Sequence, residues 1–248
     1  MFVNIRGTKE KLLIDSGHTL SIIQYKDMLY AYRGSVGFNK VDMFIGTDMD
    51  NLVFHKELTN MKGKRWPVAF KLGEYISILC TATDGMADIF EHQHIHHYTS
   101  IDGKNFNHEC VIVDGSAPWL YMEDDVTFFF YHKKRDKHRI YIRQGLDGNE
   151  YVVMETPNRD VVVSAPAVFK YKSMYYMLIE TREDATKPWV TDMLESKDVK
   201  GPYKNRRTVL DNWRACAFPH IIDDRLIITY SHKKKCGIWD LRYKEILI

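Results

Sequence analysis

The chain has 248 residues, of which 45% are hydrophobic and 27% charged, a composition that excludes a disordered or fibrous protein. Its 35 basic and 33 acidic residues leave a formal charge of +2, which gives no general reason to expect a nucleic-acid partner. No stretch approaches the roughly 20 apolar residues of a membrane helix, and the first residues lack the apolar core of a secretory signal. We therefore expect a cytoplasmic protein with no membrane partner.

One sequence phrase recurs five times along the chain. In its clearest copy, residues 165–180, Pro166 opens an apolar strand, a short polar turn follows, and an aromatic-rich strand ends at Glu180. The equivalent positions in the other copies are Leu20, Pro67, Pro118 and Pro219. Successive copies are 47 to 53 residues apart. Each step suits one four-stranded blade of a β-propeller, whose repeats run about 40–50 residues.

A second phrase lies later in the repeat and marks a tight turn. In residues 100–106 a strand is followed by Asp102, Gly103 and an aromatic residue, as expected where the third and fourth strands of a blade meet. Counterparts lie at residues 47–54, 145–151 and 196–203. Two phrases in register predict an all-β fold, a five-bladed β-propeller; the alternative is a β-sandwich with accidentally similar strands.

We expect a single propeller domain over residues 1–248. The predicted blades are residues 13–60, 61–112, 113–160, 161–212 and 213–248. The fifth blade lacks the second phrase, which makes the N-terminal segment a candidate for the strand that closes the ring.

These phrases resemble the blades of five-bladed glycoside hydrolases of families 43, 62 and 32 and of the related mannoside phosphorylases. The resemblance implies a glycosidase or transglycosidase with three carboxylates around a central funnel, the first of them just before the proline that opens the first blade. That position is Thr19 here. Its equivalents in the other blades are Trp66, Ala117, Ala165 and Phe218, so none of the five positions is acidic.

Other carboxylates lie close to the predicted funnel. Inner strands begin at its mouth and second strands end there, so both kinds of strand end are expected to line one pocket. Glycoside cleavage needs one protonated carboxyl group and one ionised carboxylate. We predict Asp15 as base or nucleophile, Glu180 as acid, and Asp84 as the group that orients the sugar or tunes the acid. Asp15 and Asp84 also fit ordinary turn positions.

Six further side chains are predicted to bind substrate. The two arginines among them are suited to hydroxyl groups or an anionic group. The set is His18, Arg33, Arg182, His220, His232 and Trp119. A structural interpretation of His220, as a hydrogen-bonded core histidine, remains open.

No cofactor motif is present, and we predict no metal site. His92, His94 and His96 would share one face of a strand and such neighbours bind divalent ions, but no further ligand lies at a recognised spacing. The four cysteines, Cys80, Cys110, Cys216 and Cys236, are widely spaced and are interpreted as reduced thiols, mostly packed in the core.

Three functions therefore remain open. The first is a glycosidase or transglycosidase acting on a saccharide or glycoside. The second is a non-catalytic propeller that binds a glycan or a protein, which the missing acids favour. The third is an enzyme for a phosphorylated or nucleic-acid-linked sugar, since basic residues at 132–135 and 232–235 would border the funnel and attract an anionic ligand.

Overall fold

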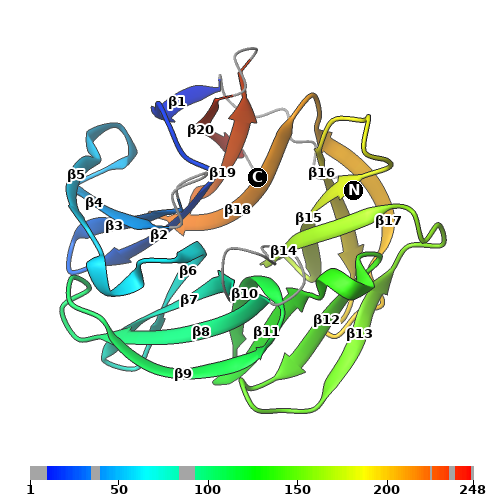
Figure 1. The fold of residues 1–248 in the computed structure, drawn as a ribbon, viewed down its shortest axis with the longest axis horizontal. Coiled ribbons are helices and arrows are strands. Elements are labelled where there is room, and N and C mark those ends of the chain that lie inside the picture. The colour runs from blue at the N-terminus through cyan, green and yellow to red at the C-terminus, as the bar shows by residue number, and fades with distance from the viewer. Residues whose placement is uncertain (1–9, 35–39, 84–92, 224, 235–237, 247–248) are drawn as a thin grey trace.

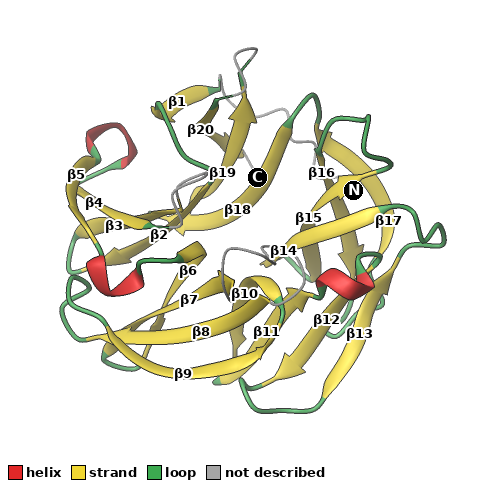
Figure 2. Cartoon of the chain, viewed as in Figure 1, coloured by secondary structure: helices red, strands yellow, loops and turns green. Residues whose placement is uncertain are grey.

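Five four-stranded antiparallel sheets surround a common axis (Figure 1). The computed structural model describes residues 10–34, 40–83, 93–223, 225–234 and 238–246. The arrangement confirms the prediction of an all-β, five-bladed β-propeller. Strands dominate Figure 2, and the helices of the described residues are three single 3-10 turns, η1 (Met49–Asn51), η2 (Thr59–Met61) and η3 (Lys134–Asp136). No helix within those ranges is both long and apolar enough to cross a membrane.

Each blade runs from an inner strand near the axis to an outer strand. Blade 1 contains β2 (Thr19–Tyr25), β3 (Met28–Gly34), β4 (Val41–Gly46) and β5 (Val53–Glu57). Blade 2 contains β6 (Lys64–Leu72), β7 (Tyr75–Thr83), β8 (Gln93–Ser100) and β9 (Asn107–Asp114). Blade 3 contains β10 (Ser116–Glu123), β11 (Val126–His132), β12 (Arg139–Gln144) and β13 (Glu150–Glu155). Blade 4 contains β14 (Val162–Tyr171), β15 (Met174–Arg182), β16 (Val190–Ser196) and β17 (Lys204–Leu210).

Blade 5 takes strands from both ends of the chain. It contains β18 (Arg214–Ile222), β19 (Arg225–Lys233) and β20 (Trp239–Ile246), and β1 (Lys11–Ile14) is its outer strand. β1 pairs antiparallel with β20, with Lys11 opposite Tyr243. The ring is therefore closed by hydrogen bonds between the first and the last strand.

The second strand of each blade forms the most buried part of the core. Phe129 and Phe130 in β11 and Leu178 and Ile179 in β15 have no exposed surface. Both faces of such a strand are covered, because each blade is packed between two neighbours. This explains why the second strands are continuous apolar runs rather than alternating ones. Full burial of one such side chain contributes about 1.5–3 kcal/mol.

Inner strands of blades 2 to 5 begin with a β-bulge. At each bulge the register between inner and second strand shifts, and one residue has a left-handed backbone. These residues are Trp66 (φ 58°), Ala117 (φ 48°), Ala165 (φ 48°) and Cys216 (φ 52°). A bulge bends its strand and redirects the neighbouring side chains. The four residues therefore hold equivalent positions around the axis.

The bulges correct the sequence alignment of blade 5. Ala217 follows the bulge residue Cys216, as Pro67, Pro118 and Pro166 follow theirs. The residue of blade 5 that is equivalent to Trp66, Ala117 and Ala165 is therefore Cys216, and not Phe218, which lies two residues later. The mismatch arises because blade 5 has alanine where the other three blades have proline, and the nearest proline is two residues further along the chain.

Candidate functional site

Three side chains from different parts of the ring meet at one mouth of the propeller. His18 precedes β2, Glu180 lies near the end of β15, and Cys216 is the bulge residue of β18. Their ligand-type atoms all lie within 4.8 Å of one another. Among the described residues, this is the only such group of three or more histidine, cysteine, aspartate or glutamate side chains. We call it the central cluster.

Direct contacts hold the central cluster together. The Cys216 thiol donates to Glu180 Oε1 at 3.4 Å. Its sulfur lies 3.6 Å from His18 Nδ1 and 3.7 Å from Nε2. Ser164 stands opposite Glu180 in the β14–β15 ladder and donates to Glu180 Oε2 at 2.6 Å. Both carboxyl oxygens of Glu180 are thus engaged.

Burial shifts the pKa of each group in the central cluster. Glu180 is 4% exposed, and burial raises its pKa although Ser164 and Cys216 hydrogen-bond to it. Burial, reinforced by the interaction with Glu180, raises the pKa of the Cys216 thiol well above its ordinary value. Burial, with a smaller contribution from Arg65, lowers the pKa of His18 to about 4. Each shift is in the direction of the uncharged form, as burial in a medium of low dielectric constant requires.

Partly exposed tryptophans lie on the His18 side of the central cluster. The His18 ring makes edge contacts with Trp66 and Trp239, at centroid distances of 5.1 and 5.2 Å. Trp239 contacts Trp213 at 6.3 Å. Trp66 lies in the β6 bulge, Trp239 begins β20, and Trp213 directly precedes β18, so all three lie at the mouth where inner and third strands begin. We call Trp66, Trp239 and Trp213 the tryptophan rim.

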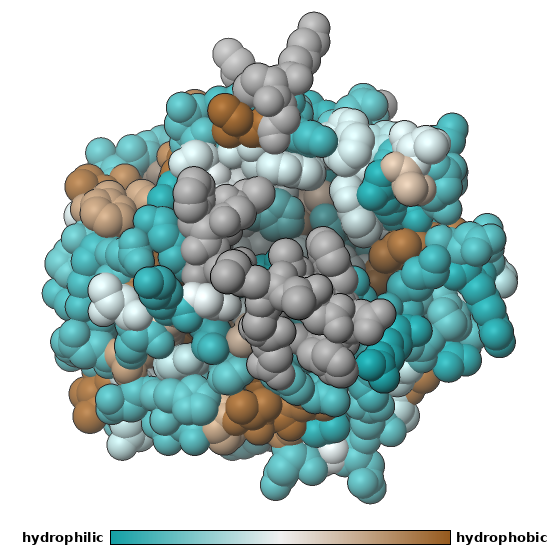
Figure 3. Space-filling view, in the orientation of Figure 1, coloured by the Kyte–Doolittle hydropathy of each residue, from teal (hydrophilic) through white to brown (hydrophobic). Residues whose placement is uncertain are grey.

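Arg182, a predicted substrate-binding residue, extends this rim. Its guanidinium lies 5.6 Å from the Trp189 ring and 5.9 Å from the Trp213 ring. Its Nε donates to the Lys187 carbonyl at 3.0 Å. Outside the grey segments, the surface seen in Figure 3 is mainly hydrophilic, and its apolar groups are separate from one another.

Asp15, another predicted catalytic residue, does not join Glu180. The Asp15 side chain is 81% exposed and pairs with Lys234 at 2.5 Å. This hydrogen bond lowers the pKa of Asp15, which holds it as a solvated carboxylate. Asp84 lies outside the described residues.

Two predicted binding residues at the mouth, Arg33 and His232, each lie beside a buried aspartate. Arg33 pairs with Asp42, which is fully buried, and donates to the Ser16 carbonyl at 2.8 Å. His232 Nδ1 lies 3.5 Å from Asp240, and burial lowers its pKa. Arg33 thereby ties β3 to β4 and to the loop before β2.

The remaining two predicted binding residues lie in the core. His220 is 6% exposed; its Nδ1 donates to the Ile22 carbonyl at 3.2 Å and its Nε2 lies 2.9 Å from Thr229 Oγ1. The structure thus agrees with the core interpretation of this histidine. Trp119 donates from Nε1 to the Val168 carbonyl at 2.9 Å and packs on Phe218.

Sequence reasoning missed Cys216 and the tryptophan rim. The sequence groups Cys216 with the core thiols. Alignment on the recurring proline puts the position equivalent to Trp66, Ala117 and Ala165 at Phe218, two residues after Cys216. The signal that could have identified the rim is positional: Trp66, Trp213 and Trp239 all stand at or just before a strand start on the same mouth.

The basic and histidine-rich segments form local contacts. Lys133 pairs with Glu150 at 2.5 Å, so its charge is already compensated. On the outer strands of blade 2, His94 pairs with Asp114 at 2.7 Å, and His96 Nδ1 lies 3.0 Å from Nε2 of His108. His92 lies outside the described residues.

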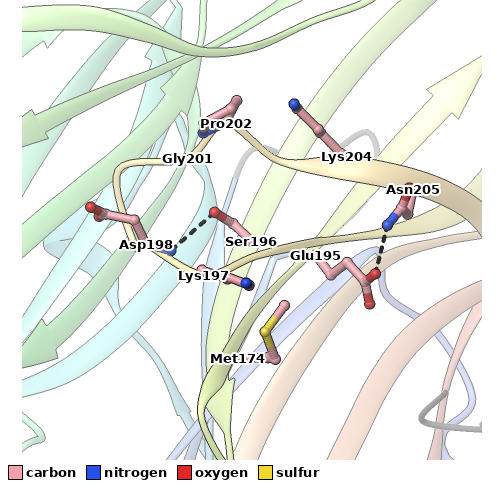
Figure 4. Close-up of a pocket in the computed structure, with 9 residues that line it drawn as sticks. All are labelled: Met174, Glu195, Ser196, Lys197, Asp198, Gly201, Pro202, Lys204 and Asn205. Carbon is pink, nitrogen blue, oxygen red and sulfur yellow. Dashed lines mark hydrogen bonds between the residues drawn. The ribbon is translucent and has the colours of Figure 1, made fainter. Parts of the chain in front are cut away.

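A pocket of about 400 Å³ lies at the other end of blade 4 (Figure 4). It is shaped by the β16–β17 turn and by Met174, which begins β15, whereas Glu180 lies near the end of that strand. Asn205 donates to Glu195 at 2.7 Å on its wall. The pocket is thus separate from the central cluster.

Comparison with known proteins identifies the fold. No protein-family model and no curated protein matches the sequence. A thermostable family 43 glycoside hydrolase of known structure superposes with a TM-score of 0.77 at 11% identity, over 100% of this chain and 93% of that one. An arabinanase from Bacillus subtilis gives a TM-score of 0.74 at 13% identity, covering 95% and 94%.

A third similar structure contains a bound sugar. The exo-β-1,3-galactanase from Phanerochaete chrysosporium, solved with β-1,3-galactotriose, gives a TM-score of 0.74 at 11% identity, over 96% of this chain and 64% of that one. The predicted resemblance to family 43 glycoside hydrolases is therefore confirmed at the level of the fold.

Proposed function

We propose that this protein binds a saccharide at the mouth that carries the central cluster. One observation carries the proposal: His18 of the polar central cluster contacts the partly exposed Trp66 and Trp239, and Trp239 in turn contacts the partly exposed Trp213. A sugar presents apolar C–H faces and hydroxyl edges. Aromatic faces and a few hydrogen-bonding groups placed together suit that combination.

The shared fold supports this proposal. The galactanase with the same architecture is known in complex with an oligosaccharide. Similarity at 11% identity does not carry its substrate over to this chain, so the argument rests on the residues at the mouth.

Glycosidic bond cleavage is the second candidate, favoured by the position of Glu180. Its carboxyl group lies at the same mouth, between Ser164 and Cys216. Cleavage requires a second carboxyl group at a suitable distance, near 5 Å for retention and about 6.5–9.5 Å for inversion. Within the described residues the central cluster holds one carboxyl group, that of Glu180. For this reason we rank binding above catalysis.

Binding to a glycan panel, followed by calorimetry on the hits, tests the first proposal. Trp66→Ala is the informative variant, because blades 3 and 4 already carry alanine at the equivalent bulge. We expect it to weaken binding roughly tenfold, which corresponds to about 1.4 kcal/mol. Asn205→Ala, in the distant pocket, is the matched control and should bind normally. Equal affinity of wild type and Trp66→Ala would refute the proposed site.

Hydrolysis of aryl furanosides and pyranosides tests the second candidate. Turnover by the wild type that disappears in Glu180→Gln would establish a glycosidase. A wild type that binds a glycan but turns over no substrate would leave the binding function alone.

A further inference from the structure

We propose that His18, Glu180 and Cys216 bind a divalent transition-metal ion of the zinc type. The three residues offer a nitrogen, an oxygen and a sulfur donor, and each comes from a different position in the ring. The inference stands apart from the saccharide proposal, since an ion can bind whether or not a sugar does.

Donor spacing is the first argument. Zinc bonds to sulfur, nitrogen and oxygen are about 2.0–2.3 Å long, so tetrahedral donors are separated by about 3.3–3.8 Å. Cys216 Sγ lies 3.4 Å from Glu180 Oε1 and 3.6 Å from His18 Nδ1, and all three donors lie within 4.8 Å of one another. An ion can therefore replace the thiol hydrogen bond once the His18 and Glu180 side chains adjust toward it. Three protein ligands leave one tetrahedral position for water or for an atom of a bound ligand.

Donor chemistry selects the ion. A thiolate and an imidazole favour zinc and its neighbours in the transition series, whereas calcium and magnesium prefer shells of oxygen ligands. A thiolate and a carboxylate also supply two negative charges, which match a divalent cation. In blade 2, His94 contacts Asp114 and His96 contacts His108, so these contacts offer imidazole and carboxylate donors but no thiolate.

The surroundings complete the site. Ser164 hydrogen-bonds the second oxygen of Glu180, which is the outer-shell support that orients a carboxylate ligand. Glu180 and Cys216 are buried, but His18 is partly exposed, and this gives an ion a route from the mouth.

Metal binding by the chelator-treated full-length chain tests the proposal. We expect one zinc ion per chain at this site, measured by calorimetry and elemental analysis. Cobalt in its place should give a thiolate-to-cobalt absorption band. A His96→Ala/His108→Ala background removes the exposed histidine pair as a competing site. Cys216→Ala should fold, because Ala117 and Ala165 hold the equivalent bulges, and it should lose the band.

Two further variants test whether zinc binds at this site. Ser164→Ala should weaken zinc binding about 10–100-fold, as the loss of an outer-shell partner does. Cys110→Ser alters an exposed thiol and should bind zinc as the wild type does. Zinc affinity unchanged in Cys216→Ala, or a cobalt complex without a thiolate band, would overturn the proposal.

Discussion

Ser164 and Glu180 face each other across the first two strands of blade 4, and the serine donates a 2.6 Å hydrogen bond to the carboxyl group. Both side chains are buried. The position of the Glu180 carboxyl group is thus fixed by a hydrogen bond from the neighbouring strand. This relationship also makes the site a contributor to stability.

Ser164→Ala should lower the free energy of unfolding by about 1–3 kcal/mol, because a buried carboxyl oxygen loses its donor. Urea denaturation followed by fluorescence measures the change. Ser77→Ala is the matched control: Ser77 is fully buried in β7, and its hydroxyl has no hydrogen-bond partner among the described residues. That variant should be neutral or slightly stabilising, and equal losses in both variants would contradict the explanation.

Glu10→Gln should weaken ring closure. Glu10 lies directly before β1 and accepts hydrogen bonds from Tyr230, Arg242 and Arg214 in blade 5. Loss of this charge should lower the free energy of unfolding by about 1–3 kcal/mol. Guanidinium denaturation measures it.

Glu10 should also make the free energy of unfolding fall at acid pH. Burial alone would raise the pKa of Glu10, but the hydrogen bonds from Tyr230 and Arg242 and the two arginine charges lower it below the ordinary 4.5. Its stabilisation is therefore present above about pH 4.5 and is lost as the pH falls through the lowered pKa. If Glu10→Gln shows the same acid dependence as the wild type, Glu10 is not responsible.

His220→Gln should flatten the pH dependence of stability between pH 6.5 and 4. Burial lowers the pKa of His220 from 6.5 to about 4, so the unfolded chain takes up a proton at a higher pH than the folded chain does. Stability is thus complete above pH 6.5 and declines toward pH 4, by roughly 3 kcal/mol for this one residue. Denaturation curves at several pH values, wild type against variant, isolate its share from that of the other buried histidines.

Asp15→Asn should leave both stability and saccharide affinity essentially unchanged. The Asp15 carboxylate in the Asp15–Lys234 ion pair is exposed, and an exposed ion pair contributes little because water screens it. Calorimetry with the best glycan and thermal unfolding measure the two quantities. A large loss of affinity would restore Asp15 to the site, in line with the role predicted from its position in the sequence.

The fold could be predicted because the same pattern of residues recurs from blade to blade. An inner strand opened by proline, an apolar second strand and an Asp-Gly turn each reflect a local rule. Blade 5 was misaligned at one point, since Ala217 replaces the proline and the bulge at Cys216 leaves no mark in the sequence. The repeats therefore predict the fold correctly, but they do not fix which residue occupies each position within a blade.

The candidate site was harder to predict for a related reason. Sequence position shows that a residue stands near the mouth, but not the direction of its side chain. Side chains alternate between faces along a strand, and a bulge resets that alternation. Glu180 points into the central cluster, whereas Asp15 lies near the mouth in the chain but points to solvent. The direction of each therefore required the structure.

Closure by β1 also bears on how the chain is made. β1 precedes the other strands of the propeller in the sequence, whereas its hydrogen-bonding partner β20 follows them, so the two are synthesised at different times. Until β20 is available, blade 5 has an unpaired edge that invites association with other chains. Joining residues more than 200 positions apart also slows folding, because a large loop must close before the contact forms. Completion of the ring therefore waits until the last strand of the propeller has been synthesised.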